Sequence, residues 1–372
     1  MRAGNPRPAP RAGHDAGPAE RRRPAALPRL APDPVRRRRR LSLAPRAPAL
    51  GRIYTRGVNA TTTTLSRIRG FALAPAQFLR LAALELFALW LIVGTGAAVR
   101  LTDSGLGCRH WPGCEKGHPL PAKDVHAYIE FGNRLVGGVT IALTLVGWLA
   151  ARRTRGLPHW VVRLSLAVFV GALAQAPLGY LAVKSDLRWP VVMAHLLLSM
   201  LLLAGAVVLV LEARAADEGH VEPLVPRELQ RLGYVFVTAC FVLVVSGTFA
   251  TAAGPHSGGG KHVDRFASLE PTVYAHAVVV AVFLAALLFS LGYLAARRER
   301  SPRLFAGGVI VLALLLVQMT IGEIQWRTHL PWGVVLAHVL LAGTVWAATV
   351  ALATLFVRPL RSLAPNVGSL DG

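Results

Sequence analysis

Eight long apolar segments follow one another along the chain, beginning at residue 79. Each has about the 20 residues that an α-helix needs to cross the hydrocarbon core of a bilayer. Only 16% of the chain is charged, against about a quarter of a soluble domain. We therefore predict an all-α integral membrane protein with eight transmembrane helices. The approximate spans are 79–100, 125–151, 159–182, 190–212, 232–253, 271–296, 304–326 and 332–357.

Basic residues are concentrated in alternate loops, and this predicts the orientation of the chain. Cytoplasmic loops of membrane proteins carry such an excess of Arg and Lys. We expect a multi-pass protein of the plasma membrane with both termini in the cytoplasm. The basic residues follow the second, fourth, sixth and eighth segments: Arg152, Arg153, Arg155, Arg214, Arg227, Arg231, Arg297, Arg298, Arg300, Arg303, Arg358 and Arg361.

Cys108 and Cys114 lie close together in the polar loop after the first apolar segment. The predicted topology places this loop on the outer, oxidising side, which favours a disulfide over two free thiols. Cys240 lies inside an apolar segment, where a small buried hydrophobic side chain is the expected role.

Residues 1–69 form a Pro-, Ala- and Arg-rich arm that holds 17 of the 41 Lys and Arg residues. The arm has no apolar periodicity, so we predict that it is disordered. Three interpretations stay open: an arm that binds nucleic acid or anionic lipid, an organelle transit segment, or a mis-assigned start with the true one near Val58. No nucleic-acid partner is inferred for the membrane part.

The apolar part of the chain repeats itself at a shift of 143 residues. The pattern Q-x3-G-x9-W-x4-A-H, which ends at His195, recurs with its end at His338, and Asn133 falls on His276. The first segments of the two halves align more loosely, through Thr95-Gly96 and Ser246-Gly247. Four spans in each half give both halves the same orientation, so we predict two parallel-repeat four-helix bundles, residues 79–212 and 232–357.

Three histidines and one asparagine are expected at one depth in the bilayer. Asn133, His195, His276 and His338 follow the outer ends of alternate segments by similar distances. Histidines at matched depth on facing helices are what the two axial positions of a heme iron require. The alternatives are polar residues that only satisfy helix contacts, or a metal-transport site.

The two halves differ at this depth, because Asn133 stands where the repeat predicts a histidine. A heme held by His195 alone would keep one axial face open, which is typical of substrate chemistry, whereas His276 and His338 together favour electron transfer. Glu130 lies one helical turn from Asn133 and is a candidate for proton transfer or for stabilising a cation. Its alternative role is a partner for Arg134 or Arg100.

The remaining polar residues of the apolar segments give weaker signals. Gln175 and Gln318 repeat, so we expect each to bond across helices within its half. Glu85 and Glu323 are expected to have similar structural roles. Arg100, Arg134 and Arg327 lie near the outer face and are candidates for pairing with heme propionates.

Residues 79–357 resemble the heme A synthase family, in an actinobacterial-like form. The resemblance rests on the segment from Gly96 to Thr102, on Ser104-Gly105-Leu106 with Cys108, and on Trp111-Pro112 with Cys114. It is completed by Ile129-Glu130-Phe131, Arg134, His276 and the Ala-His pairs at 194–195 and 337–338. Many members have histidine at the position of Asn133.

The resemblance implies an enzyme that oxidises the C8 methyl of heme O to a formyl group, giving heme A for terminal oxidases. It implies a heme b cofactor held by His276 and His338, and a substrate heme held in the first half at His195, beside Asn133 and Arg134. Glu130 matches the family's essential glutamate, and Cys108 and Cys114 match its cysteine pair. Heme O synthase and oxidase assembly factors are the implied partners.

Two other functions compete with this one. A b-type cytochrome for electron transfer would need a second imidazole in the first half, where Asn133 stands. A heme or metal transporter is suggested by the repeat alone, but transporters usually carry their polar residues on broken helices at mid-membrane. The electron acceptor, the source of the inserted oxygen and the oligomeric state do not follow from the sequence.

Overall fold

The structure, a computed structural model, describes residues 72–108, 110, 113–117, 120–121, 124–259 and 263–363, all within the compact unit Thr64–Gly372. The arm predicted over residues 1–69 lies outside them. Among these residues eight helices are long and apolar enough to cross a membrane, so the predicted fold class is confirmed. They are α2 (Pro75–Leu101), α3 (Val125–Ala151), α4 (His159–Lys184), α5 (Trp189–Glu218), α6 (Arg227–Ala253), α7 (Leu269–Ala295), α8 (Pro302–Arg327) and α9 (Trp332–Val357).

Local sequence signals determine where several helices begin and end. The Asp124 side chain caps α3 by accepting a hydrogen bond from the backbone N–H of Ala127 at 3.1 Å, which satisfies one free donor of the first turn. Proline opens α2 and α8, where its missing N–H has no helical partner to lose. α5 continues past its predicted end at residue 212, because an Ala-rich turn extends it to Glu218; Gly219, whose φ is 85°, follows the end of the helix.

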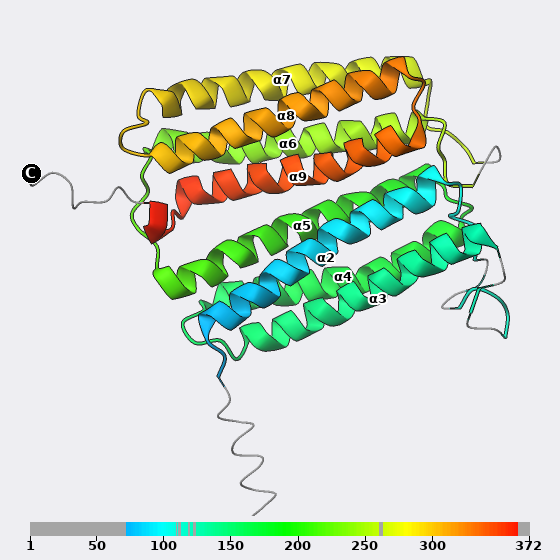
Figure 1. The fold of residues 1–372 in the computed structure, drawn as a ribbon, viewed down its shortest axis with the longest axis horizontal. Coiled ribbons are helices and arrows are strands. Elements are labelled where there is room, and N and C mark those ends of the chain that lie inside the picture. Colours follow the sequence, from blue (N-terminus) through cyan, green and yellow to red (C-terminus); the bar gives the residue numbers. More distant parts are fainter. Residues whose placement is uncertain are drawn as a thin grey trace, which may run out of the picture. The chain divides into compact units, whose positions relative to one another are not determined.

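The helices form two groups, α2–α5 (the N-terminal half) and α6–α9 (the C-terminal half), as Figure 1 shows. α2 and α5 of the first group pack against α9 of the second. Two indoles join the groups: Trp90 Nε1 donates to the Leu340 carbonyl at 3.2 Å, and Trp346 Nε1 donates to the Met200 carbonyl at 2.8 Å. The predicted domain boundaries and the parallel repeat stay predictions.

The loops before α5 and α9 share an uncommon backbone conformation, which supports the repeat. Asp186 and Leu187 have φ of 51° and 59°, and His329 and Leu330, at a shift of 143 residues, have φ of 60° and 62°. Two consecutive non-glycine residues in the left-handed region carry strain. Their recurrence at matched positions means that both halves turn into their last helix in the same way.

The bundle has two chemically different ends. We call the end with the Cys108–Cys114 loop the disulfide end, and the opposite end, with the α3–α4, α5–α6 and α7–α8 loops, the basic end. At the basic end Arg358, just after α9, binds the buried carboxylate of Glu212 on α5 through two nitrogens, at 2.7 and 2.9 Å. These hydrogen bonds raise the pKa of the Arg358 guanidinium and tie the two halves together.

Apolar side chains are exposed on the outer surface of the helices along their middle turns. Such an apolar exterior suits a protein whose surrounding solvent is lipid. Examples are Phe87, Val139, Val282, Phe289 and Ile310, each at least half exposed.

Candidate functional site

Asn133, His195, His276 and His338 lie on α3, α5, α7 and α9, the four helices that start at the disulfide end. Each follows its helix start by six to eight residues, or about 9–12 Å at ~1.5 Å rise per residue. The expected common depth is therefore present in the fold. The imidazoles of His276 and His338 lie within electrostatic reach of each other.

A hydroxyl on the neighbouring helix contacts the α3 and α7 members of this set. In the C-terminal half Ser246 Oγ lies 2.8 Å from His276 Nδ1 and donates to the carbonyl of Leu243. The hydroxyl can therefore accept the Nδ1 proton, which leaves Nε2 free to bind a metal. In the N-terminal half Thr95 Oγ1 lies 2.7 Å from Asn133 Oδ1. Thr95 and Ser246 are therefore part of the site, although the sequence indicated them only through the loose alignment of the first segments of the two halves.

The α5 and α9 members also have matching surroundings. Gln175 Nε2 donates to the backbone carbonyl of His195, and Gln318 Nε2 to that of His338, both at 3.1 Å. The expectation that both glutamines bond across helices is confirmed. These bonds fix the backbone that carries each imidazole.

Glycine leaves open space beside each imidazole. A Cβ on Gly179 would lie 3.5 Å from His195 Cε1, and Cβ atoms on Gly247 and Gly322 would lie 3.2 and 3.1 Å from the Cε1 atoms of His276 and His338. A side chain at Gly247 or Gly322 would therefore crowd the imidazole, whereas a Cβ at Gly179 would only touch it. The shared Q-x3-G spacing signals two of them, Gly179 and Gly322.

The arrangement fits a heme iron. His195 Nδ1 and His338 Nδ1 are buried and have no hydrogen-bond partner among the residues that the structure describes. A buried polar nitrogen without a partner is costly, and a ligand that coordinates to this nitrogen or hydrogen-bonds with it would remove that cost. The C-terminal half can supply two imidazoles to one iron, whereas the N-terminal half can supply one, from His195.

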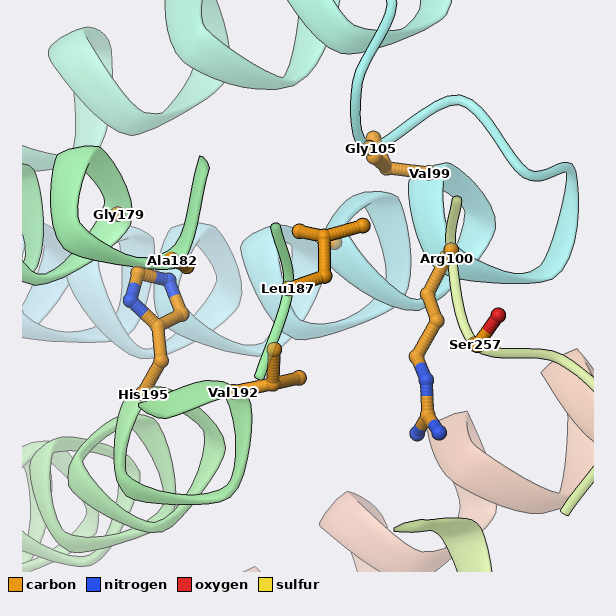
Figure 2. Close-up of a pocket in the computed structure, with 11 residues that line it drawn as sticks. Val99, Arg100, Gly105, Gly179, Ala182, Leu187, Val192, His195 and Ser257 are labelled. Carbon is orange, nitrogen blue, oxygen red and sulfur yellow. The ribbon is translucent and has the colours of Figure 1, made fainter. Parts of the chain in front are cut away.

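A cavity of about 110 Å³ opens beside His195 (Figure 2). It is smaller than a porphyrin, so a heme bound here would extend beyond it between the helices. In Figure 2, Leu187 and Val192 lie between His195 and the side chain of Arg100. The α6–α7 loop contributes Ser257 and Gly258 to the lining; this loop of the other half was not among the predicted site residues.

Glu130 on α3 is bound both by Arg134 of its own helix and by the loop between α2 and α3 that contains Cys108 and Cys114, called the disulfide loop below. It is 4% exposed, and its Oε1 accepts a hydrogen bond from Arg134 Nη2 at 2.6 Å. Its Oε2 accepts one from the backbone N–H of Cys108 at 2.7 Å, and Cys108 is bonded to Cys114 as expected. The pairing of Glu130 with Arg134, weighed above as its alternative role, is therefore present.

Arg134 binds the disulfide loop as well as Glu130. Its guanidinium donates to the carbonyls of Cys108, His110 and Gly113 at 2.6–2.9 Å. Neither Glu130 nor Arg134 lines the cavity beside His195. The direct substrate-heme role expected for Arg134 stays a prediction.

The other two arginines expected to face heme propionates differ in their surroundings. Arg100 lines the cavity and donates through Nη2 to the carbonyl of Thr251, while its Nε is buried without a partner among the described residues. Arg327 pairs with Glu323 on the exposed face of α8. Arg100 is therefore the better placed cation for an acidic group of a ligand. Trp111 and Pro112 of the sequence motif lie outside the described residues.

Comparison with known proteins gives a consistent result. The profile of the COX15-CtaA family, cytochrome oxidase assembly proteins, matches residues 79–350. The chain is 26% identical over 294 residues to a heme A synthase of Shewanella oneidensis, which covers 67% of this chain and 87% of that protein. It is 27% identical over 276 residues to a heme A synthase of Bacillus pumilus, which covers 69% and 88%. A heme A synthase of Geobacillus thermodenitrificans is 36% identical over 111 residues, which cover 28% of this chain and 33% of that protein.

Proposed function

Because the chain belongs to the family of cytochrome oxidase assembly proteins, we propose that it is a heme A synthase, a multi-pass membrane oxidoreductase. Its reaction converts the C8 methyl of heme O into the formyl group of heme A. Relatives of that name match most of their own length to this chain. The family match extends over both halves, so the reaction is assigned to the whole eight-helix unit.

The observation that carries the proposal is the asymmetry between two otherwise matching sites. His276 and His338 offer two imidazoles at one depth, and Asn133 and His195 offer one. Two imidazoles suit a resident low-spin heme, and one suits a heme that must enter, react and leave. We therefore assign heme b to the C-terminal half and heme O to the N-terminal half.

The C-terminal half would hold its cofactor through His276 and His338. When bound, heme b supplies one-electron redox chemistry. The protein's part is to orient the ligands: Ser246 accepts from His276 Nδ1, and Gln318 fixes the carbonyl of His338. Replacing a residue that orients a metal ligand in this way typically lowers metal affinity by roughly 10–100-fold.

The N-terminal half would hold the substrate through His195, with Arg100 available to a heme propionate. We assign catalysis to Glu130. Each C–H bond broken at the methyl carbon releases a proton, and a carboxylate is a base that can accept one. A fixed negative charge also stabilises positive charge that develops at that carbon. The hydrogen bonds from Arg134 and the Cys108 N–H hold the carboxylate in one orientation.

We also propose an orientation and partners. The basic end faces the cytoplasm by the positive-inside rule, so both heme sites lie toward the outer face of the plasma membrane. Heme O is hydrophobic and reactive, which favours its transfer from heme O synthase within the membrane. Heme A would then pass to assembly factors of a terminal oxidase.

Extraction of the pigments from purified protein tests the proposal. The account predicts heme b as the main pigment, with a smaller amount of heme O or heme A that exchanges with added heme. Two equivalents of tightly held heme b, with no heme O or A, would instead indicate an electron-transfer cytochrome.

A further inference from the structure

A buried carboxyl group lies in the middle of α2, far from the site described above. Glu85 is 1% exposed, and its Oε1 has no hydrogen-bond partner among the described residues. From the start and end of α2, Glu85 lies about 15 Å from the basic end and about 24 Å from the disulfide end. An unpaired carboxyl in a bilayer costs several kcal/mol when charged, and such residues are retained mainly for function.

No other ionisable side chain lies near this depth on the helices that pack against α2. Three described stretches that pack around α2 contain no ionisable residue: 135–151 of α3, 196–211 of α5 and 339–357 of α9. Arg134 lies just before the first of them, near the start of α3. On α2 itself the neighbours are the exposed Arg80, and Arg100 at the disulfide end. Among the described residues of these helices, Glu85 therefore has neither a counter-ion nor a competing base at its depth.

The neighbouring helix is built around the Glu85 carboxyl. A Cβ on Gly147 of α3 would lie 1.3 Å from Glu85 Oε1, so any residue larger than glycine would displace the carboxyl. Thr144 and Thr140 lie three and seven residues before Gly147 and share its face of α3. Both are buried, and their hydroxyls donate to the carbonyls of Ile141 and Val136. Their lone pairs stay available to a water molecule or a carboxyl O–H.

The described helices of the C-terminal half have no carboxyl group at the matching depth. The contacts of Thr95 with Asn133 and of Ser246 with His276 set the register of the halves. Ten residues before each hydroxyl stand Glu85 and Phe236. Phe236 is buried and stacks on Phe283, ring centroids 4.9 Å apart. By the 143-residue shift Phe283 matches Thr140 and Leu287 matches Thr144, whereas the buried Ser290 stands where α3 has Gly147. The carboxyl and the two threonines therefore have apolar counterparts in the C-terminal half.

We propose that Glu85 is a proton-transfer residue of the N-terminal half, exchanging protons between the basic end and the substrate side. The proposal rests on the proposed function, because oxidation of a methyl group to a formyl group moves protons as C–H bonds break. Small and polar residues follow one face of α3 between Glu85 and the substrate site, and this face marks the route of transfer. They are Gly147, Thr144, Thr140, Gly137 and Asn133. Water molecules bound to the two hydroxyls would complete the route.

Infrared spectroscopy of the purified whole protein tests proton exchange without any turnover. A protonated buried carboxyl gives a C=O band apart from those of carboxylates, and the band shifts in D2O when the proton exchanges. We expect such a band in the wild type, its shift in D2O, and its loss in Glu85→Gln. Glu323→Gln, which alters an exposed carboxyl on α8, should keep the band. A band that is absent in the wild type, or that does not shift in D2O, overturns the proposal.

Activity provides the second readout. Glu85→Gln should keep the heme b spectrum and slow heme A formation by about a hundredfold or more, because a positioned proton-transfer group typically contributes at least that factor. Glu85→Asp should restore part of the rate. A wild-type rate in Glu85→Gln overturns the proposal. If the wild type makes no heme A, the proposed function fails, whereas the D2O exchange of the Glu85 band still decides proton exchange. If Glu85→Gln does not fold, the proposal is tested by the C=O band of the wild type in D2O and by a change of that band in Glu85→Asp.

Discussion

Glu130→Gln separates the two roles that the structure gives to Glu130, because it keeps the shape of the side chain and removes its charge. Both carboxylate oxygens are in use, one with Arg134 Nη2 at 2.6 Å and one with the Cys108 N–H at 2.7 Å. A glutamine has a single acceptor oxygen, so its NH2 group would face one of these two donors. One hydrogen bond must therefore be lost at a position that is 4% exposed.

The free energy lost in Glu130→Gln depends on the hydrogen bonds that Arg134 keeps in the variant. Arg134 loses its carboxylate partner but still donates to the carbonyls of Cys108, His110 and Gly113, so its guanidinium keeps most of its hydrogen bonds. The loss is then that of one hydrogen bond to a charged group, about 2 kcal/mol, rather than the 3–5 kcal/mol of a broken buried ion pair. About 2 kcal/mol corresponds to a roughly thirtyfold larger population of the opened disulfide loop.

The assay is the rate at which an added thiol reduces the Cys108–Cys114 disulfide in membranes, followed by alkylation and mass spectrometry. We expect a roughly thirtyfold increase in Glu130→Gln and a large loss of heme A. Glu323→Gln is the matched control, because Glu323 also pairs with an arginine four residues later but is 57% exposed; it should change neither readout. Unchanged reduction together with a normal heme A yield in Glu130→Gln would refute the reasoning.

Two further predictions concern the iron ligands. His276→Ala and His338→Ala should each abolish the low-spin heme b spectrum of the purified protein, because one imidazole cannot complete six-coordination; a retained spectrum in either variant refutes the cofactor site. Asn133→His should fold and keep heme b, because the matching position in the other half carries His276 beside a hydroxyl. Its visible spectrum, recorded with added heme O, should gain a second low-spin component, and no such gain would count against an iron at this position.

Much of the fold could be predicted from the sequence because hydropathy and helix length are local properties. The predicted bounds of α3 and α9 agree with the structure, whereas α5 extends beyond its apolar segment as far as Glu218. The bonds of Gln175 and Gln318 were predictable because the repeat places both beside a histidine-bearing helix. The repeat itself and the halves as domains stay predictions.

The parts of the site that could not be predicted depend on contacts between distant segments. Nothing local indicates that the Cys108 N–H meets Glu130, or that Gly258 of the α6–α7 loop lines the cavity beside His195. Glu85 and Glu323 were expected to have similar structural roles, yet Glu85 Oε1 has no hydrogen-bond partner among the described residues while Glu323 pairs with Arg327. The position of Gly147, which makes room for Glu85, follows only from how α2 packs on α3.

The most direct test of the central claim is heme chromatography of cells that make heme O but no heme A and that express this chain. The account predicts that heme A appears with the wild type and is lost in His195→Ala, while the His195→Ala protein keeps its heme b spectrum. The account would be contradicted if these cells contained heme O and no heme A while the wild-type protein was present in the membrane with heme b bound.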